Sequence, residues 1–255
     1  MVANLAKPTP EKPALMRHDD VVTFFHEMGH VFHGLLSRTQ YSRFHGTSVA
    51  RDFVEAPSQM LESWCWEPHV LEKMSSHYEK KAPLSKELIE KIIKSRYVNV
   101  GLFYLRQLFF AKFDYKVHTD QGLFYLFSCS CSDALDFCPE KTDYTKLWND
   151  MREQISLVKY KVATPGQGTF GHITGGYDAG YYGYTYSLVF AADMYGMTSS
   201  HTSFSLYRLL MHVYVATIFK ADPLDPGRGN LYRKEILLPG GSRDEMDSLK
   251  VCNRC

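Results

Sequence analysis

The sequence has no long hydrophobic run and no segment dominated by charge of one sign. Its longest apolar-leaning run, residues 205–219, is short and is interrupted by Arg208 and His212, so we expect no membrane span. The first 13 residues contain no apolar signal core, which argues against export. Basic and acidic residues are interspersed with a net charge of +1, so no face favours nucleic acid. We therefore expect a monomeric cytoplasmic protein without a nucleic-acid or membrane partner.

Cysteine is scarce, with six residues in 255. Disulfides are disfavoured in a protein that is not exported, and Cys65, between two tryptophans, is expected to be a buried thiol. The other cysteines are Cys129, Cys131, Cys138, Cys252 and Cys255. A structural zinc site or interaction module built from these residues is an alternative, but it requires the two groups to come together in the fold.

Apolar residues make up 45% of the chain, enough for one large domain or two small ones. Prolines keep residues 1–18 extended, as a lead-in to the first helix. Apolar residues recur at helical spacing through residues 83–118 and again through 143–159. The pattern predicts a mainly α, multi-helix fold with little β-structure.

The segment with the candidate metal-binding residues is 24–33, which contains an H-E-x-x-H motif inside an apolar run. On a helix, expected over about residues 20–37, His26 and His30 share one face and can bind one metal ion, with Glu27 beside it. Zinc in a catalytic site takes three protein ligands and keeps a fourth position open, so one ligand is missing. Gly29 weakens the helix and suggests that another element packs closely there. A chance match to the motif is the alternative.

A second helix, starting near Pro57, offers the missing ligand. Glu55, Gln59 and Glu62 follow at spacings of four and three residues and share one face. Proline is tolerated in the first turn, which places Glu55 at the helix start. We predict that Glu55 is the third ligand and that Glu62 orients a ligand histidine from outside the metal shell. The alternative is that these carboxylates form a solvated helix face.

Residues 164–184 contain seven glycines, one histidine and four tyrosines, a composition that does not support a stable helix. Glycine hinges would let such a loop close on a substrate, and a tyrosine hydroxyl or histidine N–H would stabilise a developing oxyanion. We therefore expect a mobile lid. A glycine- and tyrosine-rich adhesive loop without chemistry is the alternative.

Three motifs occur in one order: the H-E-x-x-H segment, F-V-E-x-P-S-Q-x-L-E over residues 53–62, and F-G-H-x-x-G-G-Y-D-x-x-Y-Y-G-Y over residues 170–184. With them, the chain resembles the family of zinc oligopeptidases that includes thimet oligopeptidase, neurolysin and saccharolysin. The resemblance implies one zinc ion per chain and a mainly α, zincin-type catalytic domain. Short peptides are the implied substrates, taken into a deep channel between two halves.

The resemblance also implies roles for single residues. The implied zinc ligands are His26, His30 and Glu55, with Glu27 as the general base that takes a proton from a zinc-activated water. The implied contacts to the scissile carbonyl are His172, Tyr177 and Tyr184. The expected activity is that of a zinc-dependent metalloendopeptidase.

The chain departs from the family pattern in its extent. By this resemblance, residues 1–255 are expected to be a truncated C-terminal catalytic part that lacks the N-terminal half of the substrate channel. Residues 122–140 and 196–215 have no recognised counterpart and are expected to be atypical inserts. An inactive zinc-binding fragment of such a peptidase is therefore the alternative function.

Overall fold

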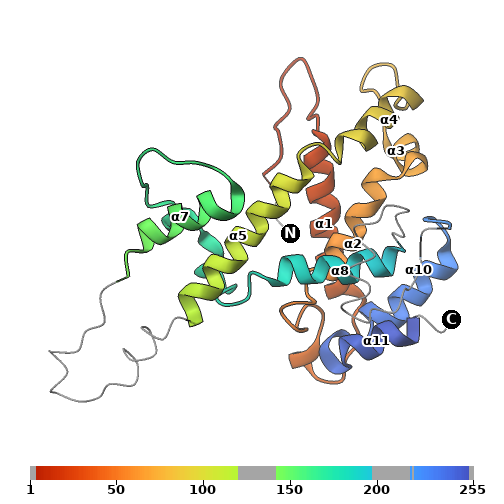
Figure 1. Cartoon of the computed structure of the whole chain (residues 1–255). Coiled ribbons are helices and arrows are strands. Elements are labelled where there is room, and N and C mark those ends of the chain that lie inside the picture. Colours follow the sequence, from red (N-terminus) through yellow and green to blue (C-terminus); the bar gives the residue numbers. More distant parts are fainter. Residues whose placement is uncertain (1–3, 120–141, 197–218, 220, 253–255) are drawn as a thin grey trace, which may run out of the picture. The chain divides into compact units, whose positions relative to one another are not determined.

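The computed structural model of the chain is built of helices (Figure 1), and the residues that it describes are 4–119, 142–196, 219 and 221–252. No strand occurs among these residues, which confirms the predicted mainly α fold. No helix within them is long and apolar enough to cross a membrane. The chain divides into two compact units, one formed by residues 1–98 with 186–255 and the other by residues 99–185.

The first unit contains most of the helices and ends at the described C-terminus. Its elements are α1 (His18–Leu36), η1 (Ser42–Phe44), α2 (Ala56–Glu62), η2 (Ser63–Trp66), α3 (Pro68–Met74), α4 (Lys86–Ser95), α10 (Pro226–Tyr232), the π-helix η6 (Arg233–Leu237), η7 (Gly240–Ser242) and α11 (Glu245–Cys252). Helix α8 (Gly183–Tyr195) belongs to this unit from Tyr186 onward.

The core of the first unit lies where α2, η2, α8 and the C-terminal elements meet. Its fully buried members include Ala56 and Met60 from α2 and Met194 from α8. Aromatic rings fill the remaining space, with Trp64 packed edge-on against Tyr195 at a centroid distance of 5.1 Å. Because α2 contributes its apolar side to this core, its other side is fixed against α1.

Helix α1 begins two residues earlier than the sequence suggests. Arg17 is the N-cap, and its backbone N–H donates to Oδ2 of Asp20 at 2.9 Å. A carboxylate in the first turn accepts this otherwise unpaired donor and complements the helix dipole. Helix α2 starts as predicted, with Glu55 as its N-cap and Pro57 in its first turn.

The second unit is organised by α5 (Val100–Thr119) and α7 (Tyr144–Ser156), followed by η4 (Gly166–Thr169) and η5 (Gly171–Ile173). Its core is almost entirely aromatic. The buried residues are Phe109, Phe113, Trp148, Phe170 and Tyr181. Two of these, Phe170 and Tyr181, come from the glycine-rich loop, so that segment contributes to the core of the second unit. Its expected movement as a lid stays a prediction.

Two predictions fall on residues that the structure does not describe. The expected insert at 122–140 lies wholly outside the described residues, and of the expected insert at 196–215 only Gly196 lies within them. Four of the cysteines, Cys129, Cys131, Cys138 and Cys255, are also outside. Within the described part, Cys65 is a free and fully buried thiol, as predicted.

Candidate metal centre

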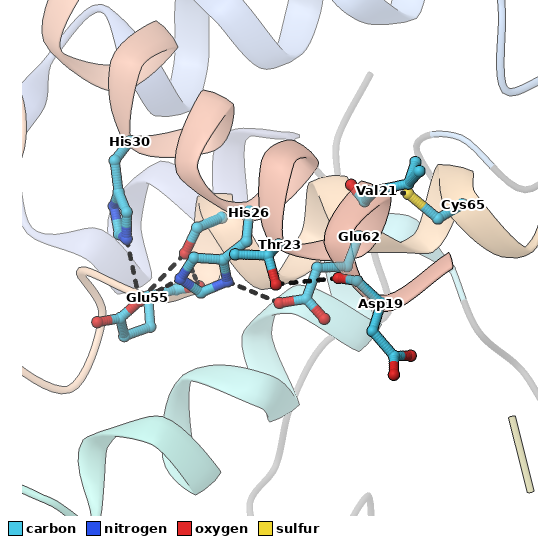
Figure 2. A network of polar contacts seen from close by, with 9 residues as sticks. Asp19, Val21, Thr23, His26, His30, Glu55, Glu62 and Cys65 are labelled. Atoms are coloured by element: carbon cyan, nitrogen blue, oxygen red, sulfur yellow. Dashed lines mark hydrogen bonds and ion pairs between the residues drawn. The ribbon is translucent and has the colours of Figure 1, made fainter. Parts of the chain in front are cut away.

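Helix α1 places His26 and His30 one turn apart, with ring centroids separated by 5.1 Å. Glu55, at the start of α2, points at both rings (Figure 2). Its Oε2 atom lies 3.2 Å from Nε2 of His26 and 3.1 Å from Nε2 of His30. The Glu55 residue is only 3% exposed, which excludes a solvated helix face at this position.

Gly29 is the reason that α2 can come so close to α1. A Cβ atom at this position would lie 2.5 Å from Cα of Ser58 and 3.1 Å from the carbonyl oxygen of Pro57. The close packing predicted at this glycine is therefore confirmed. Ser58 also fixes Glu55, since its hydroxyl lies 2.9 Å from the Glu55 carbonyl oxygen and 3.2 Å from Oε2.

The donor set fits a zinc ion. In a tetrahedral shell with bond lengths of about 2.0–2.1 Å, neighbouring donor atoms lie about 3.3 Å apart. The two distances from Glu55 Oε2 to the imidazole nitrogens are 3.2 and 3.1 Å, and all three donors lie within 4.8 Å of one another. Two imidazole nitrogens and one carboxylate oxygen leave one tetrahedral position open, which is typical of catalytic zinc.

A second carboxylate holds the other side of His26. Oε1 of Glu62, the last residue of α2, lies 2.6 Å from Nδ1 of His26 (Figure 2). Burial lowers the pKa of His26, but its hydrogen bonds to Glu55 and Glu62, and the charges of both, raise it to about 9. The excess of negative charge around His26 favours a bound cation.

The three residues predicted to contact the scissile carbonyl lie together in the second unit. The ring of His172 lies 5.8 Å from that of Tyr177 and 5.6 Å from that of Tyr184, and the two tyrosine rings are stacked at 4.9 Å. His172 is exposed, whereas Tyr177 and Tyr184 are half-buried. The glycine-rich loop thus gathers these three rings in one aromatic cluster.

Asp114 of α5 anchors this loop and was not singled out from the sequence. Its carboxylate is 1% exposed and accepts the backbone N–H groups of Ala179 and Tyr181 at 2.9 and 3.0 Å. Nδ1 of His118 lies 3.0 Å from the same carboxylate. A single acidic residue in an aromatic helix is the signal that points to such a role, because a buried carboxylate needs partners.

Comparison with known proteins identifies the family. The sequence profile of peptidase family M3 matches residues 1–254. The chain belongs to this family. It is 41% identical to saccharolysin from Saccharomyces cerevisiae, 98% of the chain matching 30% of that protein. It is also 41% identical to a thimet-like oligopeptidase from Dictyostelium discoideum, where 79% of the chain matches 28% of the relative.

A bacterial relative shows the same relationship. Oligopeptidase A from Escherichia coli is 34% identical, with 98% of the chain matched to 32% of that protein. The M3 chain thus spans between 28% and 32% of the length of these three relatives. The family membership confirms the resemblance and makes the chain a peptidase homologue.

Glu27, the predicted general base of the M3 chain, follows His26 directly on α1 and is half-buried. No hydrogen bond or ion pair among the described residues involves its carboxylate. A carboxylate that is not tied up in an ion pair is suited to exchange a proton with a reacting group.

His33 lies on the same helix, which carries four histidines, and its sequence context alone indicates no role for it. It is completely buried, and neither ring nitrogen has a hydrogen-bond partner among the described residues. Burial, followed by the charges of His30 and His45, lowers the pKa of His33 to about 4. His33 therefore lies outside the three-residue donor cluster and packs as a neutral ring.

Proposed function

We propose that this M3 chain is the zinc-dependent catalytic part of an endopeptidase that hydrolyses short peptides. The observation that carries the proposal is the placement of Glu55 Oε2 against Nε2 of both His26 and His30. Family membership supports peptide hydrolysis, and the names of saccharolysin and oligopeptidase A describe peptidases. The chain matches 30% of saccharolysin and 32% of oligopeptidase A. The activity of the whole protein is therefore part of this proposal.

In this proposal, His26, His30 and Glu55 hold the zinc. When bound, zinc supplies a Lewis acid that lowers the pKa of a coordinated water to about 7. Glu27 takes a proton from the attacking water and delivers it to the leaving amine of the peptide. Because the nucleophile is water, no covalent adduct with a side chain is required.

His172, Tyr177 and Tyr184 are proposed to donate hydrogen bonds to the oxygen of the scissile carbonyl. Their convergence in one cluster supports a shared role, since several donors aimed at one oxyanion stabilise it together. One oxyanion donor is worth about 10²–10³ in kcat. Tyr177→Phe and Tyr184→Phe are therefore expected to lower kcat by a factor of that order while zinc content stays unchanged.

The first test is cleavage of a short, internally quenched peptide by the purified chain, with bound zinc counted in the same sample. We expect cleavage that a chelator abolishes. Glu27→Gln should keep one zinc per chain and lose turnover, and its matched control is Glu72→Gln, an exposed carboxylate on α3. Unchanged turnover in Glu27→Gln would refute the assigned base.

The alternative function is decided by the same measurement. Stoichiometric zinc without cleavage identifies the chain as a metal-binding fragment of a peptidase. A cytoplasmic location and a monomeric state remain predictions from the sequence, and fractionation of cells and light scattering test them.

A further inference from the structure

We propose that Gln107 of α5 is a positioning residue for the proposed peptidase reaction, because it fixes the buried tyrosine ring against which two of the proposed carbonyl contacts pack. That ring belongs to Tyr181, whose hydroxyl donates a hydrogen bond to Oε1 of Gln107 at 2.9 Å, across 74 residues of sequence. The inference rests on the proposed function and adds to it a residue that acts through Tyr181.

Tyr181 contacts both the proposed donors and the aromatic core of the second unit. Its ring centroid lies 5.0 Å from that of His172, with the two planes nearly perpendicular at 89°, and 5.2 Å from that of Tyr184. It also packs edge-on against the buried ring of Phe170 at 5.0 Å. A ring in a close-packed group cannot shift without displacing its neighbours. The position of Tyr181 therefore sets the positions of His172 and Tyr184.

Helix α5 holds Tyr181 at both ends. The backbone N–H of Tyr181 donates to Oδ2 of Asp114 at 3.0 Å, and its hydroxyl donates to Gln107. The two acceptors are seven residues apart, nearly two helical turns, so they share one face of α5. Phe110, between them on this face, meets the ring of Tyr181 edge-on at 5.5 Å. Asp114 thus fixes the main chain of Tyr181, and Gln107 fixes the far end of its ring.

The Tyr181 hydroxyl remains a hydrogen-bond donor near neutral pH. The residue is only 5% exposed, and burial is the main reason that the pKa of its hydroxyl rises to about 12. Tyr184 raises this pKa further, whereas Arg106 and the hydrogen bond to Gln107 lower it. A neutral buried hydroxyl that loses its acceptor is costly, so the ring has to move if the acceptor is removed.

The first experiment measures kcat and KM on a short, internally quenched peptide, with bound zinc counted in the same samples. Displacing a group at a reacting centre by about 1 Å can cost about 100-fold in rate, so we expect Gln107→Leu to lower kcat by at least about tenfold. KM should change less, and zinc content should stay the same. Gln107→Glu, which keeps an oxygen acceptor, should lose much less. A smaller loss in Gln107→Leu, or one confined to KM, overturns the proposal.

The matched control is Tyr115→Phe, which removes the hydroxyl of an exposed tyrosine on the same helix. Tyr181→Phe removes the hydroxyl that Gln107 holds and keeps the apolar ring that the core requires. It should lower kcat as Gln107→Leu does, and adding Gln107→Leu to it should lower kcat no further. An unchanged kcat in Tyr181→Phe, or additive losses in the double variant, would show that Gln107 does not act through this hydroxyl.

The ring positions can also be measured without any activity, by NMR spectra of the tyrosine and histidine side chains. We expect Gln107→Leu to shift the ring signals of Tyr181, Tyr184 and His172, and Tyr115→Phe to leave them in place. Unmoved ring signals in Gln107→Leu overturn the proposal. If the unaltered chain cleaves no peptide, the proposed function itself fails, whereas the ring spectra still decide whether Gln107 holds this cluster.

Discussion

Gly29 of α1 lies directly against the backbone of Ser58 in α2, the helix that starts at Glu55. The Cβ that any other residue would carry at Gly29 would lie 2.5 Å from Cα of Ser58, a backbone atom of α2. Ser58 is three residues after Glu55 and lies within hydrogen-bond distance of its carboxylate at 3.2 Å. The space left by one missing methyl group therefore sets how close Glu55 comes to His26 and His30.

Gly29→Ala is expected to weaken zinc binding and to destabilise the chain. Alanine favours a helix over glycine by about 1 kcal/mol, but forcing apart two packed backbones costs typically 1–3 kcal/mol. The clash should win because the opposing atoms belong to the backbone of α2 and cannot rotate away. Chelator competition and thermal unfolding measure the two effects.

Gly34→Ala is the matched control for that substitution. Gly34 lies in the same helix, and a Cβ there would meet no atom within 4 Å. We expect this variant to gain stability slightly and to keep its zinc affinity. Equal behaviour of the two alanine variants would show that the contact with Ser58 does not place Glu55.

His33 should make the stability of the first unit depend on pH. Its folded pKa of about 4 is below the usual 6.5, so the unfolded chain binds a proton at pH values where the folded chain does not. The stability associated with a neutral His33 is complete above pH 6.5 and is lost as pH falls toward 4. The loss by pH 4.5 is expected to be about 2 kcal/mol, at about 1.4 kcal/mol per pKa unit.

Denaturant unfolding at pH 7 and pH 4.5 tests the role of His33, with His33→Leu as the comparison. The leucine variant keeps the other titrating groups but lacks this one, so its stability should fall less over the same interval. An identical fall in both proteins would mean that the pKa of His33 is the same in the folded and the unfolded chain.

Asp114→Asn is expected to loosen the glycine-rich loop. The amide that replaces one carboxylate oxygen brings an N–H group to a position where Ala179 or Tyr181 already donates one. Leaving a buried donor unpaired costs about 1–3 kcal/mol. Hydrogen exchange over residues 166–184 should therefore speed up, whereas exposed Asp178→Asn should leave it unchanged.

Zinc itself should stabilise the folded chain. A ligand that binds only the folded state adds about 2.7 kcal/mol when present at 100 times its dissociation constant. We expect zinc to raise the melting temperature of the unaltered chain and to have no such effect on His26→Ala. Zinc stabilisation that survives in His26→Ala but disappears when Cys252 and Cys255 are replaced would instead indicate a cysteine-based site.

Much of the candidate site could be predicted from the sequence because its residues are close together along the chain. His26 and His30 are one helical turn apart, and Pro57 marks the start of the next helix, so short-range rules place them. The assignment of Glu55 combined its helix-start position with zinc's need for a third ligand. Asp114 and His33 were not assigned because their roles depend on partners or burial that appear only when distant segments pack together.

The sequence by itself determined that the chain is mainly helical and which residues can bind a metal, since periodicity and ligand spacing are encoded in neighbouring positions. Tertiary structure decided that Glu55 is buried against both histidines and that Glu62 lies within hydrogen-bond distance of Nδ1 of His26. The physical reason is that the distance between two packed helices depends on the size of the side chains at the point where they touch. Here that volume is set by Gly29 and Ser58.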